Sequence, residues 1–428
     1  KIIKSSKDSK NKKIFKFDRQ AKQFTKPKLN EQASYLKTRN LLPVIFFFFS
    51  REKVESSSRQ LANKMKVIKN RDEIKDKYNS VFKDLTPEEI NLLNLDEHMW
   101  MWSRGVGFHH AGLAPIVKEF VEYLFLNRYI KYLFATETLA LGINMPAKSI
   151  YIDRLHKYDG IKTRPLTQSE FLQLSGRAGR RGIDDKGFAF LSYDKTINRE
   201  WYSNLFTLKP NDLISAFSVN YSSILNLLNL YTVNESVELL QKSFFAYQNM
   251  YKTDKLENIF HSKYGVLDEL GFLNSDNGRV LSQTYRDNLI PGIYLFNKET
   301  NKDIEFKLMY ISSGISNERA EFAISDKFES LFSSFQSSLE LVNKTELSNG
   351  VKKLMKLNFS WFSVFYEYMQ TNNIEYVVNK FGLNIGDFIK VAKEASELSK
   401  KLSIIYEDKD FEEINDIFNN NLIQKTMT

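Results

Sequence analysis

The stretch LPVIFFFFS, residues 42–50, contains six consecutive apolar side chains from Val44 to Phe49. A strand with one solvated face alternates apolar and polar residues. This run therefore predicts a strand covered on both faces, as in a parallel sheet.

More strands and a helix follow along the chain. The segments YIKYLFAT (129–136), KSIYIDRL (148–155) and KGFAFLSY (186–193) read as strands, and LAPIVKEFVEYLFLN (113–127) reads as an amphipathic helix. The alternation predicts an α/β domain with an open parallel sheet. Thr86 and Glu89 have the spacing of a helix capping box, and the Asp-Gly pair in 157–160 predicts a β-hairpin.

Beyond residue 200 the pattern becomes helical. Residues 264–285 read as a helix followed by a short hairpin, and nearly everything after residue 315 has helical periodicity. We expect four parts: a basic linker over 1–35, an α/β domain over 36–200, a small mixed module over 201–295 and a helical bundle over 296–428.

The positive charge is concentrated at one end. Residues 1–28 hold eleven basic and two acidic side chains, whereas the remaining 400 residues hold 50 of each. The first segment is typical of a disordered arm. Residues 128–181 form a local basic window, with ten basic and four acidic side chains.

Several classes of protein are excluded. The chain has no cysteine, so disulfides and cysteine-ligated metals are absent. The longest apolar run, residues 41–49, is much shorter than the roughly 20 residues of a membrane span. With no signal segment and a first residue that is Lys, we expect a cytoplasmic protein that is the later part of a longer one.

The segment QLSGRAGRRG, residues 173–182, combines three glycines with three arginines. Glycines allow a backbone to approach another surface closely, and a guanidinium presents fixed donors suited to phosphate oxygens. A capping box at Thr167 and Glu170 predicts a helix that extends through Gln173, Arg177 and Arg180, so that both arginines share a face. The alternative is a glycine-rich turn with a solvated or salt-bridged basic patch.

The adjacent His109 and His110 do not predict a metal site. Neighbouring residues of a strand point in opposite directions, and we expect no carboxylate partner beside them. We interpret both histidines as ordering the loop at the strand end.

Two long motifs in this order carry a resemblance. YLFATETLALGINMPAKSIYI (132–152) and TQSEFLQLSGRAGRRGIDDKG (167–187) resemble the second RecA-like domain of superfamily-two helicases, most closely the exosome-associated DExH RNA helicases and their bacterial relatives. VIFFFFSREKVE (44–55) resembles motif IV of that family. The downstream chain is similar, more loosely, to its winged-helix module and helical ratchet domain.

The resemblance implies roles for individual residues. Arg177 and Arg180 would be catalytic arginine fingers for the γ-phosphate of ATP, and Arg181 would be structural or electrostatic. Glu137 and Thr138 have a simpler alternative as the cap of the next helix. The implied ATP-binding residues are Gln173, Gly142 and Asn144, and the implied nucleic-acid-binding residues are Ser50, Arg51 and Thr136.

The sequence has no G-x-x-x-x-G-K-[ST] P-loop and no Asp-Glu-x-His box. By resemblance, both would lie on a first RecA-like domain that precedes this chain and binds most of ATP and Mg²⁺. We therefore expect the C-terminal portion of a 3′-to-5′ RNA helicase that is inactive alone. Its expected partners are single-stranded nucleic acid, preferably RNA, and that first domain, with no membrane.

Two alternatives stay open. One is a DNA-repair helicase of the same architecture, although ATET (135–138) and GRAGRRGIDDKG (176–187) favour the RNA branch. The other is a non-enzymatic nucleic-acid-binding scaffold, which the intact Arg177 and Arg180 disfavour.

Overall fold

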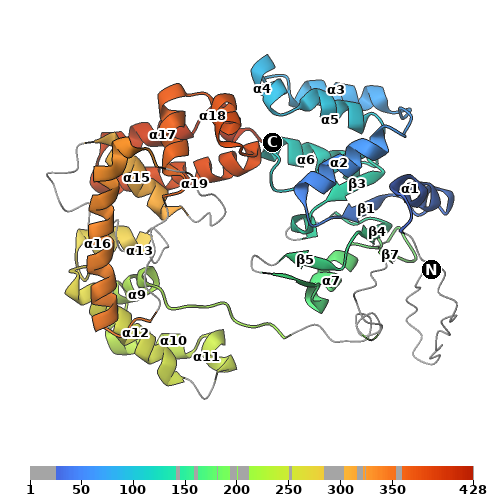
Figure 1. Cartoon of the computed structure of the whole chain (residues 1–428). Helices are drawn as coiled ribbons and strands as arrows, with labels where there is room; N and C mark the ends of the chain where they lie inside the picture. Colours follow the sequence, from blue (N-terminus) through green and yellow to red (C-terminus); the bar gives the residue numbers. More distant parts are fainter. Residues whose placement is uncertain are drawn as a thin grey trace. The chain divides into compact units, whose positions relative to one another are not determined.

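The structure is a computed structural model in which the chain divides into two compact units (Figure 1). The first comprises Lys1–Asn211 with Asn384–Asp387 and Lys425–Thr428, and the second comprises Asp212–Leu383 with Phe388–Gln424. The described residues are 26–140, 145–158, 162–180, 182–192, 200, 212–249, 253–283, 303–315, 322, 324–352 and 359–427.

The first unit is built on a five-stranded parallel sheet, which confirms the α/β prediction. The strands run in the order β2-β3-β1-β4-β7. All four predicted strands are present, and β2 joins them at one edge. Their bounds are β1 (Val44–Phe47), β2 (Val106–His109), β3 (Tyr132–Ala135), β4 (Ser149–Ile152) and β7 (Phe188–Leu191).

The central strand β1 is completely buried, as its unbroken apolar sequence predicts. It pairs with β3 and β4, so that Phe46 lies opposite both Phe134 and Tyr151. The ring centroid of Phe46 is 4.9 Å from that of Phe134 and 5.4 Å from that of Tyr151. These rings form a continuous apolar row across the middle of the sheet.

Helices and a small ribbon complete the first unit. The predicted helix over 113–127 is confirmed as α6, and Thr86 and Glu89 form the predicted capping box at α4. A predicted hairpin is confirmed as two antiparallel strands, β5 and β6. The elements are α1 (Leu29–Thr38), α2 (Arg51–Ala62), α3 (Arg71–Val81), α4 (Pro87–Leu92), α5 (Leu95–Trp102), α6 (Pro115–Leu126), the 3₁₀ turn η1 (Glu137–Ala140), β5 (His156–Tyr158), β6 (Thr163–Pro165) and α7 (Gln168–Ser175).

Helix α1 corrects the end of the predicted basic linker. The linker was expected to reach residue 35, but residues from Leu29 onward are helical. Ala33 and Leu36, three positions apart, lie on one face of α1 and are buried. The carboxylate of Glu31 accepts a hydrogen bond from the Lys28 amide at 3.0 Å where the helix begins. An interpretation based on charge alone therefore overlooked a short amphipathic element.

In the described part of the second unit, every regular element is a helix. The bounds are α9 (Tyr221–Leu228), α10 (Val233–Gln241), α11 (Phe244–Gln248), α12 (Thr253–Glu269), α13 (Asp276–Gln283), α15 (Ile304–Gly314), η2 (Asp326–Phe328), α16 (Glu329–Ser348), α17 (Phe362–Thr371), α18 (Ile374–Phe381), α19 (Ile385–Tyr406, which belongs to the second unit from Phe388 onward), α20 (Lys409–Phe418) and α21 (Asn421–Gln424). The predicted boundaries after residues 200 and 295 fall beside or within stretches outside the described residues, and the winged-helix module stays a prediction.

The short hairpin predicted at the end of residues 264–285 is wrong for the described residues, because α13 (Asp276–Gln283) lies there. Asn274 has a positive φ of 54° and separates α13 from the preceding helix. The hydroxyl of Ser275 then accepts a hydrogen bond from the amide of Gly278 at 3.2 Å, which caps the start of α13. The polar residues that suggested a hairpin turn therefore form a helix cap.

His98 is a fully buried titratable group in the core of the first unit. Its ring centroid lies 5.1 Å from Trp102 and 4.7 Å from Phe108. Among the described residues its Nδ1 atom has no hydrogen-bond partner. Burial lowers the pKa of His98 from 6.5 to about 3, so the folded state keeps this ring neutral.

We expect His98 to make the protein less stable in mild acid. Below pH 6.5 the unfolded chain binds a proton at His98 that the folded chain does not. The free energy of unfolding should therefore fall by up to about 1.4 kcal/mol per pH unit as the pH decreases toward 3. Urea unfolding between about pH 7.5 and about pH 5 should show this slope in the wild type and a smaller slope in His98→Phe. An equal reduction in slope for His261→Phe, at an exposed histidine, would contradict the assignment to His98.

Candidate functional site

The candidate site lies at the carboxyl edge of the parallel sheet. Ser50 follows β1, His110 follows β2 and Thr136 follows β3. In parallel strands these three positions meet at one edge, where open α/β sheets bind ligands. The structure therefore brings together side chains that are far apart in the sequence.

Ser50 and Arg51 begin helix α2. Ser50 is its N-cap, and its hydroxyl accepts a hydrogen bond from the amide of Lys53 at 3.5 Å. The guanidinium of Arg51 makes two contacts with the carboxylate of Asp387, which belongs to the same unit, one of them at 3.1 Å. In this structure a carboxylate thus occupies the donors that were predicted for a nucleic-acid phosphate.

The two histidines correct one expectation and confirm another. Each has a carboxylate partner, contrary to the prediction: His109 Nε2 lies 2.8 Å from Glu122, and His110 Nε2 lies 3.1 Å from Glu55. The partners come from α6 and α2, and this proximity is not visible in the sequence. His110 Nδ1 also accepts a hydrogen bond from the amide of Gly112 at 3.1 Å, so this histidine does order the loop after β2.

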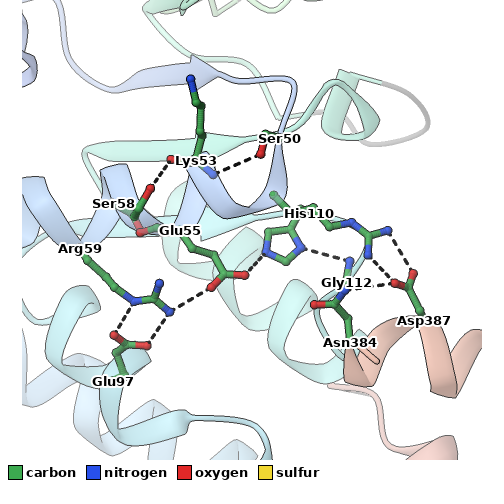
Figure 2. Close-up of polar contacts among 12 residues, drawn as sticks. Ser50, Lys53, Glu55, Ser58, Arg59, Glu97, His110, Gly112, Asn384 and Asp387 are labelled. Atoms are coloured by element: carbon green, nitrogen blue, oxygen red, sulfur yellow. Dashed lines mark hydrogen bonds and ion pairs between the residues drawn. The ribbon is translucent and has the colours of Figure 1, made fainter. Parts of the chain in front are cut away.

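Glu55 is the centre of a longer polar chain, shown in Figure 2. It accepts a hydrogen bond from Arg59 at 3.0 Å, and Arg59 donates to Glu97 of α5 at 2.6 and 3.0 Å. The hydrogen bond with His110 is the main cause that lowers the pKa of Glu55. This series of hydrogen bonds joins α2, α5 and the loop after β2.

Within the described ranges, no three His, Asp or Glu side chains are grouped as metal ligands would be.

Thr136 is buried and hydrogen-bonded. Its amide donates to the carbonyl of His109 at 3.3 Å, and its hydroxyl lies 2.8 Å from that of Thr138. The next residue, Glu137, begins η1 and pairs with Lys157 at 2.6 Å. Glu137 and Thr138 thus lie within a 3₁₀ turn in place of an α-helix, and their side chains contact Lys157 and Thr136. Their alternative role as the cap of a helix stays a prediction.

The arginines of the glycine-rich segment do not lie on a helix, which corrects that prediction. Helix α7 begins at the predicted capping box, where Glu170 accepts from the Thr167 amide at 2.7 Å. It ends at Ser175, with Gly176 as its C-cap. Gln173 is therefore an exposed residue of α7, whereas Arg177 and Arg180 follow in a loop.

Backbone pairing explains why the helix ends there. Ala178 forms a parallel bridge with Ala147: the Ala147 amide donates to Arg177 at 2.9 Å, and the Gly179 amide donates to Ala147 at 2.7 Å. Gly179 has a φ of +95°, and a Cβ atom on Gly187 would overlap the carbonyl of Ala178. The predicted close backbone approach is thus observed, between segments of the same unit.

Both candidate arginine fingers have partners inside the unit. Arg177 donates to the carbonyl of Ala140, the last residue of η1. Arg180 pairs with Asp184 through its Nε at 2.6 Å and an Nη at 2.8 Å, and its amide donates to the same carboxylate at 3.0 Å. This pairing lowers the pKa of Asp184. The predicted site residues Gly142 and Asn144, and also Arg181, lie outside the described residues.

Sequence reasoning missed Asp184 as the partner of Arg180. The spacing of four residues within GRRGIDD could have suggested it. It also missed Lys157, which lies in the predicted hairpin and contacts Glu137 and Glu170. No local spacing would have found that pair of contacts.

Comparison with known proteins identifies relatives for about half of the chain. Exosome RNA helicase MTR4 of Mus musculus is 40% identical over 215 residues, which are 49% of this chain and 20% of that protein. About half of the chain is thus similar in sequence to proteins named as exosome or DExH-box RNA helicases. ATP-dependent RNA helicase mtr4 of Schizosaccharomyces pombe is 35% identical over 54% of this chain, which corresponds to 21% of that helicase. Antiviral helicase SKI2 of Saccharomyces cerevisiae is 35% identical over 50% of this chain, which corresponds to 17% of that helicase.

The chain spans about a fifth of the length of these helicases. No protein-family model matches it. In the part of the chain that the structure describes, every helix is too short or too polar to cross a membrane.

The Arg180–Asp184 pair should stabilise the glycine-rich loop. Asp184→Asn replaces the carboxylate, which accepts three hydrogen bonds from Arg180, by an uncharged amide of similar size. We expect the free energy of unfolding to fall by about 1–3 kcal/mol, as for hydrogen bonds to charged groups. Urea unfolding would measure this loss. Asp185→Asn, at the exposed neighbouring residue, should change the value by less than about 0.5 kcal/mol; equal losses in both variants would contradict the role of Asp184.

Proposed function

We propose that this chain is the C-terminal portion of an ATP-dependent 3′-to-5′ RNA helicase. It would supply arginine fingers to the ATP site and a surface for single-stranded RNA. The main support is that one sheet edge gathers Ser50, Arg51 and Thr136, in a chain whose relatives are named RNA helicases. No observation favours the DNA-repair helicase or the scaffold over this function.

The residues present fit part of an ATP site. The loop after α7 offers two guanidinium groups, and their planar donors match phosphate oxygens. As the resemblance implies, we assign Mg²⁺ and most of the contacts with ATP to a first RecA-like domain of the same polypeptide. When bound, ATP supplies the phosphoanhydride whose hydrolysis drives movement along the strand.

The arginines would act by exchanging one acceptor for another. Arg180 would leave Asp184, and Arg177 would leave the carbonyl of Ala140, to donate to phosphate oxygens where negative charge develops. A carboxylate and a phosphate oxygen are similar acceptors, so the guanidinium loses little hydrogen bonding in the exchange. Gln173, exposed on α7, would contact the nucleotide from the same element, and Gly142 and Asn144 remain proposed as its other ligands.

Arg177→Ala and Arg180→Ala in the full-length protein should each reduce kcat for ATP by at least about a hundredfold, because an arginine finger contributes roughly 10³–10⁵ in rate. Binding of single-stranded RNA should change little, because neither arginine is assigned to the strand. Steady-state turnover and an RNA-binding titration measure the two effects. Arg154→Ala, at a side chain that is 61% exposed, serves as the matched control. Near-normal turnover in either finger variant would leave that arginine with a structural role only.

Thr136→Val should uncouple RNA from ATP turnover. Valine keeps the branched shape but removes the hydroxyl that contacts Thr138 and that we assign to the RNA backbone. We expect reduced RNA stimulation of ATPase activity and a nearly unchanged salt dependence of RNA binding.

Deletion of residues 1–25 should have the opposite effect. This segment carries nine basic and two acidic side chains, and each neutralised phosphate contributes about 0.7 to the salt slope for single strands. The slope should flatten while stimulation persists. Loss of stimulation on deletion, with normal stimulation in Thr136→Val, would assign RNA binding to the basic segment instead.

A further inference from the structure

The β5–β6 ribbon carries an ion cluster that joins two functional segments of the first unit. In its antiparallel register Lys157 lies directly opposite Arg164, so both side chains project from the same face. The ammonium of Lys157 contacts Glu137 of η1 at 2.6 Å and Glu170 of α7 at 2.9 Å. Arg164 contacts both oxygens of Glu170 at 2.9 Å.

Low exposure and a helix cap hold the side chains of this cluster in place. The side chain of Lys157 is only 14% exposed and that of Glu170 is 21% exposed, which shields the pair from solvent. Glu170 is also fixed by the capping box with Thr167 at the first turn of α7. Arg164 and this capping bond lower the pKa of Glu170, so its carboxylate stays charged at every physiological pH. Among the described residues, the cluster contains two cations, Lys157 and Arg164, and two anions, Glu137 and Glu170.

The other end of the α7 segment contacts the same 3₁₀ turn. Arg177 donates to the carbonyl of Ala140, which ends η1. The turn η1 is thus joined to α7 at two points, through Lys157 at the beginning of the helix and through Arg177 just beyond its end. Two separated contacts fix the orientation of a helix relative to its neighbour, whereas a single contact lets it pivot.

We propose that Lys157 is a positioning residue that makes η1 and α7 move together, so that a strand bound at Thr136 changes the placement of Arg177 and Arg180. The inference rests on the proposed function. Thr136 directly precedes η1, and its hydroxyl contacts Thr138 within the turn. A displacement of this turn is transmitted through Glu137, Lys157 and Glu170 to the first turn of α7, without any contact between Lys157 and either ligand.

Removal of the ammonium has a specific physical consequence. In Lys157→Met the stem keeps its length, but Glu137 loses its cation and lies close to Glu170, which retains Arg164. The first contact point between η1 and α7 is then replaced by repulsion, while the second, at Arg177, persists. Lys157→Arg restores a cation whose fork can donate to both carboxylates.

The test uses the full-length protein and a single-stranded RNA oligonucleotide. In Lys157→Met we expect the RNA-stimulated kcat to fall about two- to thirtyfold, the range for residues that transmit coupling without touching a ligand. Turnover without RNA and the Kd for the oligonucleotide should change less than about twofold, and Lys157→Arg should restore most of the stimulation. Lys64→Met, at an exposed lysine of the same unit, should behave as the wild type.

Two outcomes of this assay would overturn the proposal: an equal loss of basal and stimulated turnover in Lys157→Met, or no loss at all. A double variant with Glu137→Gln should be no worse than Lys157→Met alone, because both changes remove the same contact. Additive losses would also overturn it.

Amide hydrogen exchange separates this inference from the proposed function. In the absence of any ligand, Lys157→Met should exchange faster than Lys64→Met both in η1 and in the first turn of α7. If the wild type showed neither RNA binding nor RNA-stimulated ATPase activity, the proposed function would fail. Faster exchange in both segments of Lys157→Met would still support the coupling of η1 to α7 through Lys157. Unchanged exchange in either segment would contradict the coupling of η1 to α7 through Lys157, even if the protein is an active helicase.

Discussion

The parallel pairing of β1 with its two neighbours determines the direction of every other element at the site. Phe47, the last residue of β1, lies opposite Ala135 of β3 and Ile152 of β4, so these strands end level with one another. Every side chain of β1 is buried, which leaves no place on the strand itself for polar chemistry. The loops that follow the strands must therefore carry it, and they emerge side by side.

Within the first unit, carboxylates neutralise several of the candidate cations. Arg51 contacts Asp387, Arg180 contacts Asp184 and Lys157 contacts Glu137 and Glu170. A phosphate that approaches such arginines competes with a built-in acceptor instead of filling a vacant site. Binding then depends on geometry more than on net charge, which agrees with the balanced charge of the chain beyond residue 28.

The sequence predicts the elements that have strong local signals. It does not predict features that depend on contacts between segments far apart in the chain. The apolar run of β1 and the capping boxes at Thr86 and Thr167 were sufficient for their elements. The end of α7 was not, because the loop after Gly176 pairs with Ala147, some thirty residues earlier in the chain. The carboxylate partners of His109 and His110 were missed for the same reason. Asn274 and Ser275 suit a hairpin turn and a helix cap equally well, so a hairpin was predicted where the structure has the start of α13.

The bridge between Ala147 and Ala178 has a consequence for the stretch that contains Gly142 and Asn144. Ala140, before this stretch, accepts a hydrogen bond from Arg177, and Ala147, after it, exchanges hydrogen bonds with Arg177 and Gly179. Arg177 thus contacts the chain on both sides of the stretch, through its side chain before it and through its backbone carbonyl after it. These contacts are made by residues on either side of 141–144 and not by that stretch itself. A substitution at Gly142 or Asn144 therefore leaves intact the hydrogen bonds that hold the backbone carrying Arg177.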